Sequence, residues 1–241
     1  MNGNLKPMLG ERIQVGYSIV PYFNSLLLMN EGSGSTLKDC GGNSNPGILY
    51  NGSWTAGKFG CAVVCNGTST FIDLGTILPR VSWPCALAAW VKFNVTNAQQ
   101  TIVYMGDGIA SGSSTDNFRL FLSTDGKIRA GAWRGSGGGS IASTTVLQPN
   151  VWYHLVAWFP IYGYFGIFVN GILEAYGSTG ETVSLSTPWY QSIGAWVVPG
   201  TGAQEYVNGV IDHAYILDKQ TTVQEIQNLY MNPFGMFEEE M

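Results

Sequence analysis

The segment that most constrains the fold of this chain is 151–176, VWYHLVAWFPIYGYFGIFVNGILEAY. It holds two apolar runs with the period of a β-strand, Trp152–Phe159 and Tyr164–Val169. Aromatic residues of the first run fall on both faces of such a strand, so both faces are expected to be buried. The second run reaches Asn170-Gly171 and resumes as Ile172–Tyr176. Asn-Gly between apolar runs is the strongest short-range hairpin signal, because a type I′ turn needs positive φ at both central residues. The segment therefore predicts antiparallel strands with a packed face.

The rest of the chain repeats this pattern of short apolar runs separated by turn residues. Turn signals recur roughly every 8–12 residues, which is typical of an all-β sandwich or barrel. With 241 residues and no Pro-rich or charge-rich linker, the chain suits one large domain. We assign 1–25 to an N-terminal arm or edge strand, 26–234 to the β domain and 235–241 to an acidic C-terminal tail. Further strands are expected near 47–50, 59–65, 69–74, 85–93, 100–105, 117–123, 127–133, 141–147, 189–197 and 206–217.

One helix is predicted, close to the C-terminus. Thr222 followed three residues later by Glu225 fits the capping box, in which the two side chains bond each other's backbone N–H groups. Pro233 ends the helix, because proline lacks a backbone N–H. We expect a helix near 222–231 that docks an apolar stripe on the sandwich. The stripe has four residues at helical spacing: Val223, Ile226, Leu229 and Tyr230.

Charged residues are scarce. They make up 11% of the chain, against roughly 25% in ordinary soluble domains. The surface must then be covered by uncharged polar residues and glycine, or by other subunits, since interface cores are depleted in charge. We therefore expect a homo-oligomer or docking on a larger assembly. Eleven basic residues and a net charge of −5 argue against a nucleic-acid partner.

The N-terminal sequence MNGNLKPMLGERIQVGYSIV lacks a basic region followed by seven or more apolar residues, so we predict no signal peptide. No run of 18 apolar residues exists, and we predict no membrane insertion. On a regular strand Cys61 and Cys65 would lie about 13 Å apart, at roughly 3.3 Å per residue. That separation is too long for a disulfide. We predict free thiols at all four cysteines: Cys40, Cys61, Cys65 and Cys85.

Several blocks of the chain resemble a known family in their order and spacing. They are LLLMNEGSGSTLKDCGGNSNPGIL, GKFGCAVVCNGTSTFIDLG, LAAWVKF, WYHLVAWF with GIFVNGILEA, and GVIDHAYILDKQTTVQEIQNLY. Together, from about residue 26 to 232, they resemble concanavalin A-like, laminin-G-type jelly-roll domains. The resemblance implies an all-β, two-sheet antiparallel jelly-roll sandwich, in agreement with the strand pattern.

The flanking blocks LKPMLGERIQVGYSIV and LYMNPFGMF resemble stand-alone versions of this domain from bacteriophages and environmental viral sequences. This narrower resemblance implies a place on the virion, at the capsid surface or a fibre. The partners would be other virion proteins or copies of the chain itself. The chain has Asp212-His213 where the family often has Asp-Glu, and Asn66-Gly67 where it often has Asp-Gly. Both departures remove a carboxylate and weaken the expectation of metal or acid chemistry there.

The carboxylates do not suggest a glycosidase. Glycoside hydrolysis needs two carboxylates flanking one bond. Asp107, Asp116 and Asp125 fall in predicted loops, and Glu174 follows the Asn-Gly hairpin. Because no two acids have the close spacing that hydrolases of this fold carry on one strand, we predict no catalytic residues.

The histidines do not indicate another class of enzyme, and phosphate-binding motifs are missing. His154 shares a strand face with apolar residues, so a hydrogen-bonded core histidine is the preferred interpretation. His213 also lies within a strand and has no adjacent Cys or Ser. A nucleophile elbow and the glycine-rich phosphate loops are missing from the sequence.

A structural calcium ion is considered at the loop KDCGGNSNPG. Asp39, Asn43 and Asn45, with Asp212 from a distant strand, could supply oxygen ligands. The alternative is turn chemistry, in which these side chains bond the nearby backbone. We favour the turn and predict no metal or other cofactor.

Carbohydrate binding would need exposed aromatic side chains with polar neighbours. The candidates are Trp133 and Arg134 beside a glycine-rich loop at Gly135–Ser140, together with Trp189, Tyr190 and Trp196. The alternative for each tryptophan is core packing. The leading hypothesis is a non-enzymatic structural or interaction protein, a phage decoration or accessory protein. The second is a glycan-binding lectin, and the third is a glycoside-active enzyme.

Overall fold

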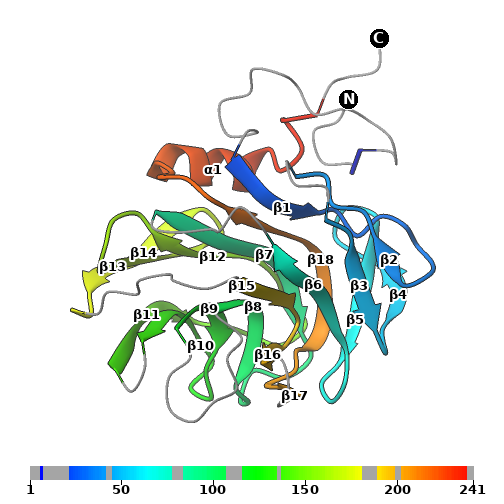
Figure 1. The fold of residues 1–241 in the computed structure, drawn as a ribbon, viewed down its shortest axis with the longest axis horizontal. Helices are drawn as coiled ribbons and strands as arrows, with labels where there is room; N and C mark the ends of the chain where they lie inside the picture. Colours follow the sequence, from blue (N-terminus) through cyan, green and yellow to red (C-terminus); the bar gives the residue numbers. More distant parts are fainter. Residues whose placement is uncertain are drawn as a thin grey trace.

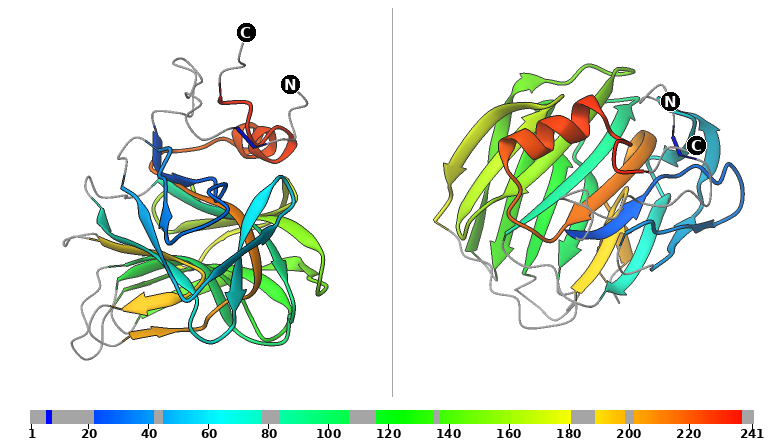
Figure 2. Two further views of the ribbon diagram at one scale, coloured as in Figure 1. Left: turned by 90° about the vertical axis from the view of Figure 1, so that its right-hand side faces the viewer. Right: turned by 90° about the horizontal axis from the view of Figure 1, so that it is seen from above.

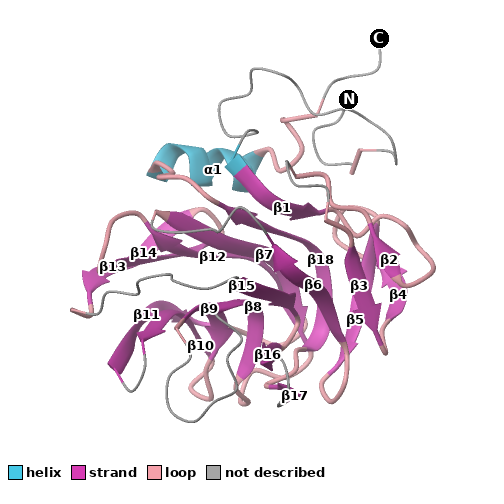
Figure 3. Ribbon diagram, viewed as in Figure 1, coloured by secondary structure: helices cyan, strands magenta, loops and turns pink. Residues whose placement is uncertain are grey.

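The computed structural model describes residues 6–7, 22–41, 45–77, 84–106, 116–134, 137–180, 189–198 and 202–237. Strands dominate these residues, and a single helix lies near the C-terminus (Figures 1 and 3). The helix is α1 (Val223–Met231), and the strands are β1 (Phe23–Leu27), β2 (Thr36–Leu37), β3 (Gly47–Tyr50), β4 (Ser53–Ala56), β5 (Cys61–Asn66), β6 (Phe71–Ile77), β7 (Cys85–Phe93), β8 (Gln100–Gly106), β9 (Asn117–Leu122), β10 (Lys127–Arg134), β11 (Gly137–Val146), β12 (Trp152–Phe159), β13 (Tyr164–Val169), β14 (Ile172–Ser178), β15 (Trp189–Ile193), β16 (Trp196–Val198), β17 (Gly202–Gln204) and β18 (Asn208–Leu217).

The strands form two eight-stranded antiparallel sheets. Sheet I has the order β14-β13-β12-β7-β18-β5-β4, and β1 also pairs with β18. Sheet II has the order β11-β10-β9-β8-β15-β6-β3-β2. Strands β16 and β17 form a separate hairpin. Neighbours far apart in sequence, such as β7 beside β18, are expected of a jelly roll, and the predicted all-β two-sheet sandwich is confirmed.

The Asn-Gly hairpin forms as predicted. Asn170 and Gly171 have φ of 50° and 76°, and Val169 pairs with Ile172 across the turn. Glycine is also needed here for contact, because a Cβ at Gly171 would lie 2.8 Å from a ring carbon of Tyr230 on α1. The turn of sheet I and the C-terminal helix are therefore packed directly together.

Both faces of the central strands of sheet I are buried, as their apolar patterns predict. The main core lies between the two sheets and takes Leu155 and Phe159 from β12. A second apolar cluster lies on the outer face of sheet I and takes Val156 and Trp158 from the same strand. Helix α1 covers this outer face (Figure 2).

Helix α1 begins and ends close to the predicted bounds. Thr222 Oγ1 accepts a hydrogen bond from Glu225 N at 3.1 Å, and Glu225 Oε2 accepts one from Thr222 N at 2.8 Å. The capping box is thus complete. Ile226 and Leu229 are buried against sheet I, and the helix ends two residues before Pro233.

Some predicted boundaries are wrong. Gly135–Ser140 is not all loop, because β11 begins at Gly137 and pairs with β10. The predicted strand 189–197 is two strands, β15 and β16, separated at Gly194, which has a φ of 86° that breaks the extended conformation. Short strands β2, β4 and β17 carry too few apolar residues to be recognised from sequence.

The remaining predictions about the chain concern thiols and membrane spans. All four cysteines are free thiols. Burial raises the pKa of the Cys65 thiol to about 12 and that of Cys40 to about 11. In the part of the chain that the structure describes, no helix is long and apolar enough to cross a membrane.

Candidate functional site

The outer face of sheet II carries side chains that the core does not use. Strand alternation sends Leu120 of β9 and Ala132 of β10 into the main core. Their neighbours Arg119 and Trp133 must then lie on the opposite face. The strands are in register there, since Gly131 of β10 pairs with Arg119.

An arginine and several aromatic rings meet on this face. The Cζ atom of Arg119 lies 4.2 Å from the ring centroid of Trp133, 4.5 Å from that of Trp196 and 5.1 Å from that of Phe121. Its Nη1 atom is 3.1 Å from Glu205 Oε2. We call these five residues the Arg119 cluster. A guanidinium between two indoles is held by cation–π attraction and by the partly buried ion pair with Glu205.

The indole of Trp133 lies flat on the sheet because two glycines make room for it. A Cβ at Gly131 would be 2.2 Å from indole Cη2, and a Cβ at Gly138 would be 2.2 Å from indole Cδ1. Gly138 is the cross-strand partner of Trp133. Trp133 remains partly exposed. One face of the indole lies on the two glycines and the guanidinium of Arg119 lies over the ring, so a ligand can contact the part of the ring that stays exposed.

Glu205 holds the cluster to the neighbouring strands. Its carboxylate also accepts hydrogen bonds from Thr101 Oγ1 at 2.6 Å and Gln99 Nε2 at 2.7 Å. Its backbone has a φ of 53°, uncommon for a residue other than glycine. Burial lowers the pKa of Arg119, while the charge of Glu205 opposes that shift. The guanidinium keeps its charge, because arginine is not deprotonated in proteins.

Two N–H groups of the Arg119 cluster are buried and have no hydrogen-bond partner among the described residues. They are Nε of Arg119, a residue only 8% exposed, and Nε1 of Trp196. Buried donors nearly always have acceptors, so such exceptions call for an explanation. Oxygen atoms of a ligand that enters the cluster would provide acceptors.

The same face continues past the cluster to two tyrosines. On β8 the hydroxyl of Tyr104 lies directly above Gly106. A Cβ at Gly106 would be 2.2 Å from the hydroxyl oxygen. Tyr190 of β15 pairs with Gly106 and is half-buried. Burial, followed by the hydrogen bond and charge of Asp73, raises the pKa of the Tyr190 hydroxyl. Tyr190 is therefore a neutral hydrogen-bonding group.

Three of the five predicted ligand-binding residues share this face. Trp133 and Trp196 flank Arg119, and Tyr190 lies farther along the sheet. Arg134 and Trp189 belong to β10 and β15, but their side chains lie outside the described part of the structure.

The sequence analysis missed Arg119 and Glu205, which organise the cluster. The signal for Arg119 was a basic residue at the centre of the alternating strand Asn117–Leu122, NFRLFL. No local signal marks Glu205, which is 86 residues away from Arg119 in sequence.

The calcium hypothesis gains no support from the loop that suggested it. The carboxylate of Asp39 accepts backbone hydrogen bonds from Leu26, Gly41 and Asn45 at 2.8, 2.7 and 3.1 Å. This is the turn chemistry that we favoured; Asn43 lies outside the described residues. Asp212 does not join Asp39, since its Oδ1 lies 2.8 Å from Lys6 Nζ. Among the residues that the structure describes, no three His, Cys, Asp or Glu side chains could hold a metal ion.

The carboxylates considered for glycoside hydrolysis have other roles where they are described. Asp125 forms an ion pair with Arg129 at 2.9 Å. Glu174 accepts hydrogen bonds from the backbone and side chains of Thr144 and Thr145. Asp116 directly precedes β9, and Asp107 lies outside the described residues.

His154 is the core histidine that its strand pattern predicts. It is fully buried, and its Nε2 lies 2.8 Å from the Tyr215 hydroxyl. Burial, with a smaller contribution from the charge of His213, lowers the pKa of His154 to about 3. His213 is also buried, and its Nδ1 lies 3.2 Å from Asp212 Oδ1.

The two-sheet jelly roll is an architecture shared by lectin domains, viral capsid proteins and cupins. The family model described as the concanavalin A-like lectin/glucanases superfamily matches residues 66–227, and the chain belongs to this superfamily. This confirms the resemblance at the level of the family. No curated protein sequence matches the chain.

Solved structures with the same fold include binding domains. Domain 4 of AbnA, a GH43 extracellular arabinanase from Geobacillus stearothermophilus solved with arabinotriose, has a TM-score of 0.69 at 19% identity, covering 87% of this chain and 98% of that domain. The botulinum neurotoxin serotype D binding domain has a TM-score of 0.65 at 16% identity, covering 89% of this chain. The chain spans about half (52%) of that toxin domain. At these identities the likeness shows the fold alone.

Proposed function

We propose that the protein binds carbohydrate on the outer face of sheet II, at the Arg119 cluster, and leaves the bound sugar chemically unchanged. The observation that carries the proposal is the flat indole of Trp133 on Gly131 and Gly138, beside a buried arginine. The apolar C–H face of a sugar ring would pack against the part of this indole that the sheet and Arg119 leave exposed. The hydroxyl groups of the sugar would accept hydrogen bonds from Nε–H of Arg119 and Nε1–H of Trp196, which have no acceptor among the described residues, whereas Nη1 of Arg119 is already bonded to Glu205.

Two comparisons support this class of ligand. Domain 4 of the arabinanase was solved in complex with arabinotriose. Cell entry of botulinum neurotoxin type C, whose structure has a TM-score of 0.63 with this chain, depends on interaction with two ganglioside molecules. We propose no catalytic step because the carboxylates of Asp125 and Glu174 are engaged, the first in an ion pair with Arg129 and the second in a hydrogen bond from Thr145.

The test is retention on immobilised oligosaccharides, arabinotriose among them. The Trp133→Ala variant should lose most of the retention and keep its fold, because this indole lies on the surface of sheet II. Tyr162→Ala is the matched control, since Tyr162 is an exposed aromatic residue in the turn between β12 and β13 of sheet I. Unfolding of the Trp133→Ala protein would assign the residue to the core. Release of reducing sugar by the wild-type protein would disprove the non-enzymatic proposal.

We also propose the virion as the site of action, as a decoration or accessory protein. The support is the resemblance of the flanking blocks to phage-encoded domains and the low charge content of 11%, which suits a surface covered by neighbouring subunits. Mass spectrometry of purified particles tests this proposal. If the chain is absent from purified particles, the virion proposal is wrong and only the carbohydrate-binding proposal remains.

A further inference from the structure

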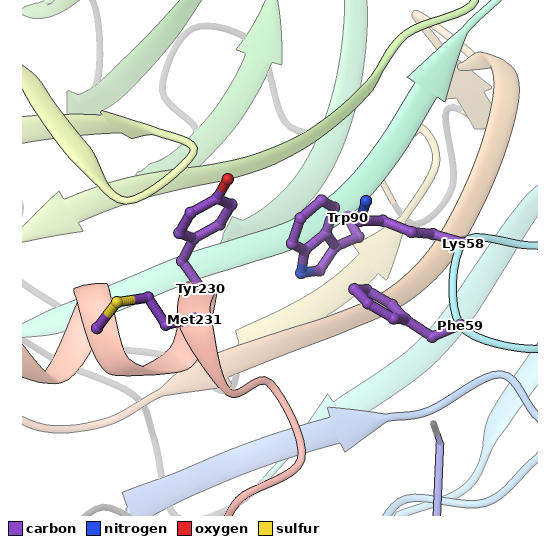
Figure 4. A pocket seen from close by; sticks show the side chains of 5 residues that line it. All are labelled: Lys58, Phe59, Trp90, Tyr230 and Met231. Atoms are coloured by element: carbon purple, nitrogen blue, oxygen red, sulfur yellow. The ribbon is translucent and has the colours of Figure 1, made fainter. Parts of the chain in front are cut away.

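A second concave site lies on the opposite side of the molecule, between sheet I and helix α1. It has a volume of about 400 Å³, and the described residues that line it are Lys58, Phe59, Trp90, Tyr230 and Met231 (Figure 4). These side chains come from the β4–β5 loop, β7 and α1. The Arg119 cluster, on the outer face of sheet II, is not part of this pocket.

Aromatic rings form the floor and walls of the pocket. The ring of Phe59 meets that of Trp90 edge-on, with centroids 5.1 Å apart. The ring of Tyr230 is nearly parallel to that of Trp90, with centroids 5.6 Å apart and an interplanar angle of 17°. Apolar and aromatic walls of this kind bind the face of a ring.

The polar groups of the pocket are hydrogen-bond donors. Nε1 of Trp90, a residue only 3% exposed, has no hydrogen-bond partner in the part of the chain that the structure describes. Figure 4 shows this nitrogen directed toward the space between Tyr230 and Phe59. The Nζ atom of Lys58 lies 4.7 Å from the ring centroid of Trp90 and forms no ion pair with the described residues. A buried N–H donor and an unpaired cation together favour a negatively charged acceptor.

The loop that carries Lys58 is fixed in place by a buried carboxylate. Asp212 Oδ2 accepts the backbone N–H groups of Lys58 at 2.7 Å and Phe59 at 3.0 Å. Gly57 is required at the start of the loop, because a Cβ there would lie 2.2 Å from Asp212 Oδ2. The other oxygen of Asp212 binds Lys6 at 2.8 Å, so this carboxylate is already engaged and does not neutralise the ammonium group of Lys58. The backbone of the loop is therefore held in place, while the ammonium group of Lys58 forms no ion pair with the described residues.

We infer that this pocket binds a carboxylate carried on a six-membered ring, with the carboxylate at Lys58 and Trp90 Nε1 and the ring against Phe59 and Tyr230. Two sources share this chemistry, an acidic sugar and an aromatic acid. Both place an anionic oxygen beside an apolar ring face. The inference is independent of the proposed function, because it uses another face of the molecule.

Calorimetric titration separates these sources. D-glucuronate represents the acidic sugar and benzoate the aromatic acid, while D-glucose and benzyl alcohol, in which CH2OH replaces the carboxylate, are the matched neutral probes. We expect at least one acid to bind and its neutral counterpart not to bind. Binding of neither acid, or equal binding of acid and neutral probe, would overturn the inference.

Variants assign the binding to the pocket. Lys58→Gln should weaken binding of the acid by about ten-fold, as expected for loss of a charge-assisted hydrogen bond. Lys38→Gln removes another exposed lysine charge and should have no effect. Trp133→Ala on sheet II should also leave acid binding unchanged. If Lys58→Gln binds like the wild type, or if Trp133→Ala abolishes acid binding, the acid does not use this pocket.

Discussion

At the scale of single residues, Gly131 determines how Trp133 can be used. The Gly131→Ala variant would place a methyl group where the indole now lies, at 2.2 Å from Cη2. The indole must then tilt away from the sheet, which displaces it from Arg119 and changes the part of the ring that is exposed. We expect several-fold weaker retention on immobilised oligosaccharide with an unchanged fold. Gly177→Ala on β14 is the control, since no atom lies within 4 Å of its added Cβ. Equal retention by wild type and Gly131→Ala would mean that the flat indole is not the binding surface.

Residues of the site could be predicted from sequence only where the residue type itself carries the signal. Trp133 and Trp196 are predictable because a tryptophan next to turn residues is a candidate for ligand stacking. Their meeting around Arg119 could not be predicted, because it depends on β9 and β10 lying in register and on the separate β16–β17 hairpin. Such contacts follow from tertiary structure.

At the scale of elements, a carboxylate of β14 links the edges of the two sheets. Glu174 accepts hydrogen bonds at 2.9 Å from the backbone N–H groups of both Thr144 and Thr145 on β11, and at 3.1 and 2.5 Å from their hydroxyls. Hydrogen bonds to a charged group are each worth about 1.5–3 kcal/mol. We expect Glu174→Gln to lower the free energy of unfolding by about 1–3 kcal/mol, measured in urea.

Glu31→Gln is the matched control for this link. Among the described residues, the carboxylate of Glu31 accepts one hydrogen bond, from the backbone N–H of Lys38 at 2.8 Å. Its replacement should cost clearly less stability than Glu174→Gln. Equal losses in the two variants would show that Glu174 does not hold the sheet edges together.

The elements that sequence predicts best are those that local interactions determine. Asn170-Gly171 and the Thr222–Glu225 capping box span a few residues, and both form as predicted. The Glu174 link joins residues 30 positions apart, and the pairing of β7 with β18 joins strands that are far apart in the sequence. Neither contact has a signal in the local sequence. The sequence patterns therefore predicted the strands but not their order in the sheets.

At the scale of the whole molecule, two buried histidines should make the fold sensitive to acid. The pKa of His154 is lowered to about 3, and that of His213 is also lowered, chiefly by burial. An unfolded histidine has a pKa of about 6.5. Below that pH the unfolded chain binds a proton at His154 that the folded protein does not bind. The free energy of unfolding should therefore fall by about 1.4 kcal/mol per pH unit for this residue, down to about pH 3.

Asp212 adds to this effect at lower pH. Burial would raise its pKa, but the hydrogen bond and charge of His213, followed by those of Lys6, lower it to about 2. Its contribution to stability is present above the unfolded value of about 3.9 and is lost as the pH falls toward 2. Urea unfolding at pH 7.5, 5.5 and 4.5 measures the histidine effect. Equal stability at the three pH values would contradict it, and His154→Gln should reduce the slope.

The surface of the molecule leads us to expect self-association. Only 11% of the chain is charged, and β14 is an edge strand of sheet I with Ile172 65% and Tyr176 51% exposed. An exposed apolar edge offers unpaired backbone groups to a second copy, and a lysine on the edge opposes such pairing. Sedimentation velocity should show association that increases with protein concentration, and Ile172→Lys should shift it toward monomer. Ile161→Lys, which changes an exposed isoleucine outside the strands, should not. A wild-type monomer at high concentration would show that uncharged polar groups alone cover this surface.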